Sequence, residues 1–350
     1  MKKETKKKRI AIIGHFGGEH VFNDGQTVKT KILYEELVKT GLYDITCVDT
    51  YLKKMHPIKL AFSTLVALIQ NKDIIVLLSG NGMRLYFPVL SFCAKIFNKN
   101  IYHDVIGGNL DSYVRKYPKF KSYLMSFKVN WVETEVLRKR LVDVGVINCE
   151  VIPNFKNLKI ISVLPMPSSN GPYKFCTFSR VMKEKGIEDA IKAVQFVNEN
   201  KGIDCALDIY GTVDPEYTYR FEKIMEASPD YIAYKGVVPY SESVDAIKNY
   251  YALLFPTYWY GEGFPGTLVD AFSAGLPIIC TDWGSNSEIV KNNYNGLVYT
   301  GDYKELINAI MSLIRKSEQI TEIKQNCLKT AYCYQPDEYI RRINKWIASN

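Results

Sequence analysis

Residues 252–279 read ALLFPTYWYGEGFPGTLVDAFSAGLPII, a stretch that predicts a strand, a glycine-rich loop and a helix in succession. Glycine lets backbone N–H groups approach a ligand closely, and the free amides and dipole of a helix N-terminus attract phosphate. The loop carries one acid, Glu262, and a second acid, Asp270, follows about two helical turns later. One carboxylate can hold sugar hydroxyls while the other holds ribose hydroxyls. The alternative is a plain strand–loop–helix with two surface acids.

A basic segment lies earlier in the same half of the chain. Residues 178–186 read FSRVMKEKG and follow the first predicted strand of this half. Arg180 and Lys185 fall on a strand-to-helix turn, where cations can neutralise a diphosphate leaving group. By themselves they are typical of a solvated surface, but their position ahead of the acidic loop favours a site.

The whole chain alternates short apolar β-type runs with amphipathic stretches, the pattern of parallel sheets. Its 350 residues exceed what one core usually serves, and a Pro/Ser/Gly cluster at residues 165–172 separates two halves. We therefore predict an α/β protein with Rossmann-like domains at 1–156 and 173–332, a linker at 157–172 and a C-terminal helix at 333–350. Ligands of such sheets lie beyond the carboxyl ends of the strands.

The block at 262–279 resembles the E-x7-E motif of family-4 retaining glycosyltransferases of the GT-B fold, with Asp270 at the second acidic position. FSRVMKEKGIEDAI (178–191) is similar to the Arg/Lys donor-phosphate segment of that family, LDIYG (207–211) to its next strand and TDWGSNSEIV (281–290) to the sequel of the motif. In the first half the resemblance is looser: IAIIGHFGG (10–18) resembles the glycine loop and VIPNF (151–155) the end of that domain. It implies two facing domains with an interdomain cleft, and a C-terminal helix that crosses back to the first domain.

The resemblance also implies roles for individual residues. Arg180 and Lys185 would contact the donor diphosphate, and Glu262 would hold hydroxyls of the transferred sugar. Asp270, one methylene shorter than the glutamate of the family, would contact the ribose. His103 matches a histidine near the transferred sugar, with a structural histidine at a strand end as the alternative. The other implied donor-binding residues are Gly17 and Gly18 in the first domain and, through their backbone amides, Phe264, Gly266, Thr267 and Leu268 in the second.

Neither a metal nor another cofactor is expected, because the sequence contains no D-x-D and no His/Cys cluster with ligand spacing. The cations Arg180 and Lys185, with the helix dipole near Thr267, would take the place of a divalent ion. Anomeric configuration would be retained, and an oxygen of the donor phosphate would accept the proton of the acceptor hydroxyl. The eight cysteines form no CxxC pair and indicate reduced thiols.

Basic residues are concentrated in the first half, where residues 1–130 contain 21 Lys/Arg and 10 Asp/Glu. This excess indicates a polyanionic partner, or only a solvated surface. Two apolar stretches, Ile58–Ile69 and Leu85–Phe97, are bordered by basic residues, which are Lys53, Lys54 and Lys59 for the first stretch and Arg84 and Lys95 for the second. They are either core helices or, where exposed, an interfacial patch for an anionic membrane.

No segment predicts a signal peptide or a membrane-spanning helix. We therefore predict a cytoplasmic protein, peripheral at the inner face of the cell membrane. Its expected partners are a nucleotide-sugar, with UDP as the nucleotide, and a glycan or lipid-linked glycan acceptor of a bacterial surface polysaccharide.

Three other functions compete with this interpretation. A GT-B-fold nucleotide-sugar epimerase shares the fold and the donor but needs no acceptor. A dinucleotide-dependent dehydrogenase is disfavoured, because GHFGG at 14–18 does not fit G-x-G-x-x-G. A non-catalytic membrane or nucleic-acid-binding protein fits the basic first half. The chain lacks an RNA-binding signature or a basic helix with interleaved aromatic residues, so nucleic acid is not an expected partner.

Removal of metal ions tests whether sugar transfer proceeds without a divalent ion, as the absence of a D-x-D sequence predicts. We expect sugar transfer to proceed at an unchanged rate in excess EDTA, because side-chain cations and a helix dipole supply the positive charge. Loss of transfer in EDTA, restored by Mg²⁺ or Mn²⁺, would show that the cations of the chain do not suffice.

Overall fold

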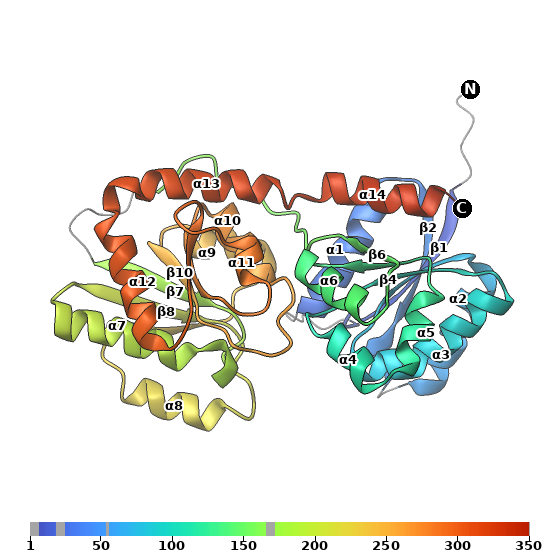
Figure 1. The fold of residues 1–350 in the computed structure, drawn as a ribbon, viewed down its shortest axis with the longest axis horizontal. Coiled ribbons are helices and arrows are strands. Elements are labelled where there is room, and N and C mark those ends of the chain that lie inside the picture. The colour runs from blue at the N-terminus through green and yellow to red at the C-terminus, as the bar shows by residue number, and fades with distance from the viewer. Residues whose placement is uncertain (1–6, 19–24, 54–55, 166–171, 350) are drawn as a thin grey trace. The chain divides into compact units, whose positions relative to one another are not determined.

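The computed structural model describes residues 7–18, 25–53, 56–165 and 172–349 and divides the chain into two compact units (Figure 1). The first unit is Met1–Asn157 with Pro336–Asn350, and the second is Leu158–Gln335. Each unit contains a sheet of six parallel strands, so the predicted α/β class with two Rossmann-like sheets is confirmed.

The sheet of the first unit has the strand order β2-β1-β3-β4-β5-β6. Its strands are β1 (Lys8–Gly14), β2 (Tyr43–Asp49), β3 (Asp73–Leu77), β4 (Asn100–Asp104), β5 (Val129–Val132) and β6 (Cys149–Val151). Its helices are α1 (Gly25–Lys39), η1 (Thr50–Lys53), α2 (Pro57–Gln70), α3 (Gly80–Ile96), α4 (Leu110–Lys116), α5 (Lys119–Met125), α6 (Glu135–Asp143) and α14 (Pro336–Ala348).

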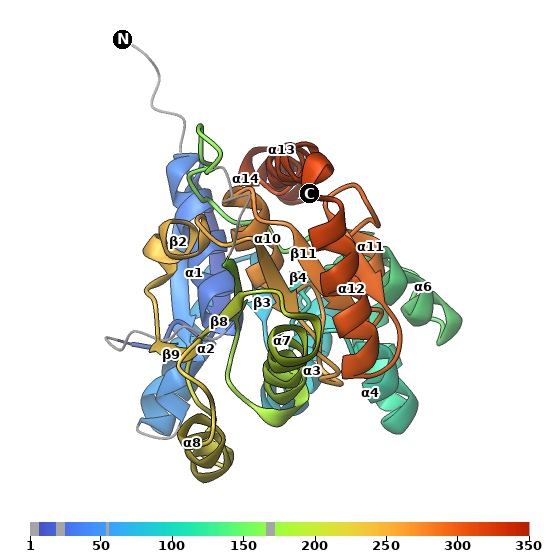
Figure 2. The ribbon, with the colours of Figure 1, turned by 90° about the vertical axis from the view of Figure 1, so that its left-hand side faces the viewer.

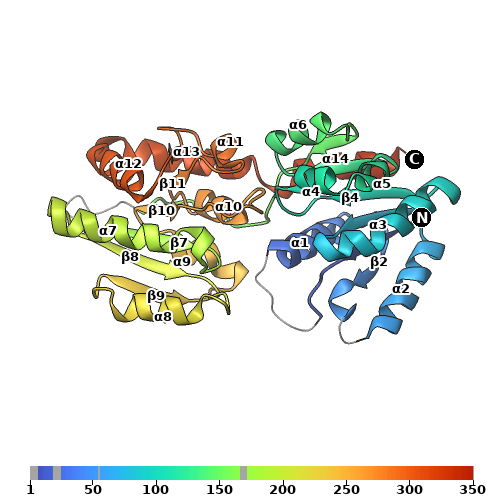
Figure 3. The same ribbon diagram turned by 60° about the horizontal axis from the view of Figure 1, so that its bottom comes forward.

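Helices cover both faces of this first sheet, which explains why its central strands are continuous apolar runs (Figure 3). One face carries α2 to α6, which pack around a core that includes Phe87 and Leu90. The other face carries α1 and α14. In the strand order, β2 lies on one side of β1 and the later strands lie on the other. The connection from β1 to β2 therefore moves along the sheet in the opposite direction from the connections that follow it. Right-handed crossovers therefore place α1 opposite α2.

Helix α14 returns the end of the chain to the first unit. The ring of Tyr339 stacks on Phe155 with centroids 5.7 Å apart, and the Arg342 guanidinium donates to Glu150 Oε1 at 2.9 Å. Further along the helix, Asn344 Oδ1 accepts from the Tyr43 hydroxyl at 2.8 Å. Residues 336–348 thus complete the core of a unit whose other elements all precede residue 158.

The sheet of the second unit has the order β12-β11-β10-β7-β8-β9. Its strands are β7 (Tyr173–Phe178), β8 (Cys205–Tyr210), β9 (Ile232–Gly236), β10 (Ala252–Phe255), β11 (Ile278–Thr281) and β12 (Gly296–Tyr299). Its helices are η2 (Lys183–Lys185), α7 (Ile187–Lys201), α8 (Thr218–Glu226), η3 (Tyr240–Glu242), α9 (Ser243–Ile247), α10 (Gly266–Ser273), α11 (Asn286–Ile289), α12 (Tyr303–Arg315), η4 (Ser317–Gln319) and α13 (Ile320–Tyr332).

The second unit is also a three-layer structure. Helices α7 and α12 lie side by side on one face of the sheet (Figure 2). Helices α9 and α10 pack on the other face with the C-terminal part of α13. Strand order changes direction at β7 and β10, which are neighbours in the sheet, so the loops after these two strands leave toward opposite faces.

The segment at 157–172 differs from a simple linker in its first half. Leu158 is buried in the second core, and the Ile161 N–H donates to the Ser273 carbonyl at 3.1 Å. The apolar residues at 158–161 explain this packing, since the Pro/Ser/Gly composition begins only at residue 165. Residues 166–171 of the predicted linker lie outside the described residues.

Truncation of a buried side chain on α14 tests the role of this helix in the first unit. Ile343 is fully buried. We expect Ile343→Ala to lower the free energy of unfolding by about 2–5 kcal/mol, because it leaves a cavity. The measurement is urea unfolding followed by tryptophan fluorescence.

Arg341→Ala is the matched control, because Arg341 lies on the exposed side of the same helix. Its effect should stay within about 0.5 kcal/mol. If Ile343→Ala changes the free energy of unfolding as little as Arg341→Ala does, then packing of α14 contributes nothing to the stability of the unit.

Candidate functional site

The candidate site of the second unit lies where β7, β10 and β11 end. The carboxyl ends of parallel strands meet at one edge of a sheet, and the segments after these three strands contact one another there. They contain Lys185 after β7, Glu262 after β10 and Thr281 at the end of β11. These are the segments in which the sequence predicted a donor site.

A glycine fixes how closely the first two segments approach. Gly186 has a φ of +70°, and a Cβ atom placed there would lie 2.1 Å from the carbonyl oxygen of Pro256. Only glycine therefore fits at this turn between η2 and α7. The Tyr258 N–H also donates to the Glu184 carbonyl at 2.8 Å. The basic turn is thereby held directly against the loop that follows β10.

This contact brings Lys185 and Glu262 together. The ammonium of Lys185 lies 2.5 Å from Glu262 Oε2, which also accepts from the Thr257 hydroxyl at 2.9 Å. The Lys185 ammonium lies over two rings as well, 5.4 Å from the centroid of Phe255 and 4.9 Å from that of Trp259. Both charged side chains are at least nine-tenths buried, so each neutralises the other away from water.

The loop at 257–262 is fastened to the segment after β11. The Thr281 hydroxyl donates to the Thr257 carbonyl at 2.5 Å, and the Trp283 indole N–H donates to the Trp259 carbonyl at 2.8 Å. Gly261 accommodates the ring of Trp259, which would lie 2.8 Å from a Cβ atom at that position. These bonds hold the backbone that presents Glu262, and sequence reasoning had not assigned roles to Thr257, Thr281, Trp259 or Trp283.

Helix α10 begins directly after this loop. The N–H groups of Gly266 and Thr267 belong to its first turn, where intrahelical partners are lacking. The Thr267 hydroxyl is buried and has no hydrogen-bond partner among the described residues. The N–H of Leu268, by contrast, donates to the Pro265 carbonyl at 3.0 Å. Gly266 and Thr267 are thus positioned as predicted for an anion site, whereas the amide of Leu268 is already engaged.

Two other predicted donor-binding residues point into the core. Asp270 is buried, and its Oδ1 accepts from the Ser243 hydroxyl at 2.8 Å, which ties α10 to α9. Phe264 is buried with its ring edge-on to Tyr334, at a centroid distance of 4.9 Å. The structure therefore does not bring the side chain of Asp270 to Glu262, whereas the predicted contact of Phe264 is through its backbone amide and stays a prediction. The short side chain of Asp270 is instead held by the hydrogen bond from Ser243 of α9.

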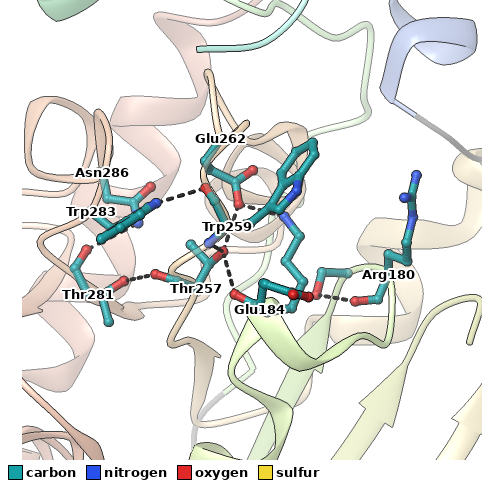
Figure 4. Close-up of polar contacts among 10 residues, drawn as sticks. Arg180, Glu184, Thr257, Trp259, Glu262, Thr281, Trp283 and Asn286 are labelled. Atoms are coloured by element: carbon teal, nitrogen blue, oxygen red, sulfur yellow. Dashed lines mark hydrogen bonds and ion pairs between the residues drawn. The ribbon is translucent and has the colours of Figure 1, made fainter. Parts of the chain in front are cut away.

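Arg180 is the exposed cation of the site. It follows β7, and its guanidinium is turned away from the Glu262 carboxylate (Figure 4). No hydrogen bond or ion pair of this guanidinium occurs within the part of the chain that the structure describes. Its charge therefore stays available, in contrast to that of Lys185.

The glycine loop of the first unit is held by an acid at the end of β2. Gly17 and Gly18 have positive φ, +84° and +57°. The N–H of Phe16 donates to Asp49 Oδ1 at 2.9 Å, and the N–H of Gly18 donates to Asp49 Oδ2 at 2.8 Å. Both carboxylate oxygens of Asp49 thus bind backbone amides of the loop. This engagement disfavours the dinucleotide alternative, in which an acid after the second strand binds a ribose.

His103 is a core residue in this structure. It lies in β4, is fully buried and packs edge-on against Phe87 at 4.9 Å. Its Nδ1 contacts Asn130 Oδ1 at 3.0 Å. Burial lowers the pKa of His103 to about 4, against the opposing effect of the Asn130 hydrogen bond and together with the charge of Lys29. This position does not fit the predicted contact with a transferred sugar, because strand and helix side chains enclose the ring.

A buried charged cluster lies at the carboxyl edge of the first sheet, next to His103. Lys29 of α1 lies 2.7 Å from Asp104 Oδ1 and 3.0 Å from Glu133 Oε1. Burial lowers the pKa of Lys29, but the two carboxylates outweigh it and raise the pKa overall. Burial raises the pKa of Asp104 to about 6, although Lys29 acts against it. The sequence alone did not reveal this cluster, because its members lie far apart along the chain.

Comparison with known proteins identifies the family. The family model "Glycosyl transferases group 1" matches residues 166–330, which include Arg180, Lys185, Glu262 and helix α10. The second unit belongs to the group 1 glycosyl transferases. The predicted resemblance to retaining glycosyltransferases of the GT-B fold is thus confirmed, and the matched region coincides with the second unit.

Relatives and solved structures extend this finding. The chain is 24% identical over 202 residues to the alpha-galactosylglucosyldiacylglycerol synthase of Streptococcus pneumoniae, an alignment that covers 54% of the chain and 52% of the relative. The chain thus spans about half the length of that relative.

Solved structures are similar over nearly the whole chain. Anabaena Alr3699/HepE in complex with UDP has a TM-score of 0.70 at 14% identity, covering 98% of this chain and 100% of that one. Sucrose-phosphate synthase from Thermosynechococcus elongatus has a TM-score of 0.77 at 16% identity, covering 98% and 99%. The fold is GT-B.

The pH dependence of stability tests whether His103 acts as a neutral core residue. The unfolded chain protonates His103 below its ordinary pKa of 6.5, whereas the folded chain does so only near pH 4. The contribution of neutral His103 to the free energy of unfolding is therefore lost as the pH falls from 6.5 to about 4. We expect His103→Gln to gain roughly 3 kcal/mol relative to the wild type between pH 6.5 and pH 4, measured by urea unfolding.

Asp104 acts with the opposite sign, because its raised pKa lets the folded state bind a proton first. It is present in both proteins and cancels in the comparison. Parallel stability curves for the two proteins would show that His103 titrates normally and is reached by water.

Proposed function

We propose that this protein is a retaining glycosyltransferase that moves a sugar from a UDP-sugar to a glycan acceptor. The observation that best supports this is the state of Glu262. Its Oε2 is held by Lys185 and Thr257, whereas its Oε1 has no partner among the described residues. A buried carboxylate fixed through one oxygen can accept hydrogen bonds from sugar hydroxyls through the other.

The groups around Glu262 suit a diphosphate. The guanidinium of Arg180 is unpaired among the described residues, and the Thr267 hydroxyl and the first-turn amides of α10 offer hydrogen-bond donors at a helix N-terminus. Lys185 adds a second cation beside the carboxylate. These donors stabilise negative charge that grows on the leaving phosphate, and they do so most strongly away from water.

The proposed reaction needs no protein carboxylate at the anomeric carbon. The oxygen of the acceptor hydroxyl forms a bond to the anomeric carbon as the bond from that carbon to the phosphate oxygen breaks. The hydroxyl proton passes to the departing phosphate, and attack from the same face retains the configuration. Glu262 and the cations act by positioning the donor and by stabilising the diphosphate.

The comparisons support the choice of nucleotide and the class of acceptor. HepE, which shares the fold, was crystallised with UDP and with UDP-glucose. The pneumococcal relative is named for a galactosylglucosyldiacylglycerol. We therefore propose that the second unit binds a UDP-sugar and the first unit binds the acceptor. The proposed acceptor is a lipid-linked glycan at the cytoplasmic face of a bacterial membrane, in the synthesis of a surface polysaccharide.

Substitutions in the site test the proposed function. We expect Glu262→Ala to keep UDP affinity but to lower kcat/KM by roughly 100-fold, because only sugar contacts are lost. Arg180→Ala should weaken UDP binding by roughly tenfold, because it removes a charge-assisted contact. Lys185→Ala should impair both. The measurements are calorimetric titration with UDP and transfer assays with a panel of UDP-sugars.

Lys183→Ala is the matched control, because Lys183 is an exposed lysine of the same turn, and it should leave both quantities unchanged. Because Lys185 contacts Glu262, its substitution should cost less transfer in the Glu262→Ala background than in the wild type. Wild-type transfer by Glu262→Ala would refute the assignment. Release of a free epimer without an acceptor would favour the epimerase instead.

A further inference from the structure

Two neighbouring helices of the first unit expose the same pattern of apolar side chains. On α2 these residues are Ile58, Phe62, Leu65 and Ile69, which are 84%, 67%, 55% and 68% exposed. On α3 they are Leu85, Val89, Phe92 and Ile96, which are 67%, 48%, 54% and 63% exposed. Both sets have the spacing i, i+4, i+7, i+11, which places four side chains in one row along a helix. We call these eight residues the apolar rows.

Helices α2 and α3 cover the same face of the sheet, and both rows lie on the sides of these helices that face away from it. The opposite sides of the helices, with Leu60 and Leu68 of α2 and Phe87 of α3, are buried in one core. The helices lie next to each other (Figures 1 and 3), and the hydroxyls of Thr64 and Tyr86 join them at 3.1 Å. Helices α2 and α3 follow β2 and β3, two parallel strands of the same sheet, and therefore run in the same direction. The apolar rows therefore form one exposed surface rather than two.

The charge around this surface has a single sign. Helices α2, α3 and α5 contain no Asp or Glu. The acids between residues 50 and 132 are Asp73, Asp104 and Asp111, and all three are buried. Lys59 and Lys95 lie on the two helices and Lys72 follows α2. These three lysines make no ion pair with any described residue, so their charges face solvent.

We propose that the apolar rows of α2 and α3 form a docking surface for an anionic lipid bilayer. Each row extends over roughly 17 Å of helix, and an amphipathic helix of this kind lies in the membrane plane with its apolar side buried roughly 5–10 Å. Among the described residues, no helix is long and apolar enough to span a membrane. The surface therefore binds from one side, through inserted Phe62 and Phe92 and through lysines at the level of the lipid phosphates.

The charges favour a bilayer over a second copy of the chain. A symmetric dimer through this surface would bring two sets of lysines together with no exposed acid of the segment to pair them. Anionic headgroups supply the missing negative charge. The proposal deepens the proposed function, because a lipid-linked acceptor lies in such a membrane. Its test measures lipid binding without sugar transfer, so that either proposal can fail alone.

Co-sedimentation with vesicles tests the surface in the full chain. We expect binding to vesicles of phosphatidylcholine mixed with phosphatidylglycerol, weaker binding at high salt, and little binding to phosphatidylcholine alone. Phe62→Glu with Phe92→Glu should lower the partition coefficient by roughly tenfold or more, because two large apolar side chains no longer insert. Lys59→Glu with Lys95→Glu should lower it by at least roughly fivefold for each lysine.

The control is Tyr219→Glu, because Tyr219 is 75% exposed on α8 of the second unit. It should bind vesicles as the wild type does, and all variants should retain the thermal unfolding midpoint and UDP affinity. Wild-type vesicle binding by the double phenylalanine variant would overturn the proposal, as would failure of the wild type to bind anionic vesicles. A dimer in sedimentation velocity that this variant abolishes would assign the surface to a second copy and also overturn it.

Discussion

The contact between Gly186 and the Pro256 carbonyl is the constraint on which the candidate site depends. No other residue type fits between the turn after β7 and the end of β10, since a Cβ atom would lie 2.1 Å from the carbonyl oxygen. The turn can therefore approach until the ammonium of Lys185 reaches Glu262. A bulkier residue would separate two buried opposite charges, and an unpaired buried charge is far costlier than the pair.

The ion pair with Glu262 gives the two cations of the site, Lys185 and Arg180, different roles. Lys185 neutralises Glu262 and fixes its orientation together with the Thr257 hydroxyl, so the carboxylate is held rigidly in the absence of a ligand. Arg180 has no such partner in the part of the chain that the structure describes, and it remains on the surface. Preorganised charge of this kind has no reorganisation cost during a reaction. The hydrogen bonds from Thr281 and Trp283 extend the rigidity to the backbone of the acidic loop.

The first unit has a different design. The carboxyl edge of its sheet is occupied by internal charge, where Lys29 is enclosed by Asp104 and Glu133, and by Asp49, which binds the glycine loop. The apolar rows of α2 and α3 lie apart from these groups, on the side of the helices that faces away from the sheet. Strand ends and helix faces can change independently, because the sheet core between them supplies the stability.

The sequence by itself determined the two parallel sheets, the position of the basic turn and the acidic loop, and the apolar spacing of α2 and α3. These features are local: periodicity, glycine placement and charge order act over a few residues or one helix. The burial of the His103 and Asp270 side chains was decided only by the tertiary structure. A motif specifies which residue stands at a position, but burial depends on the elements that pack against it, such as Ser243 beside Asp270 and Phe87 beside His103. The Lys29 cluster and the exposure of the apolar rows likewise depend on contacts between distant segments. Apolar spacing is the same whether a helix face is covered or faces solvent, so only the fold could decide between core and surface.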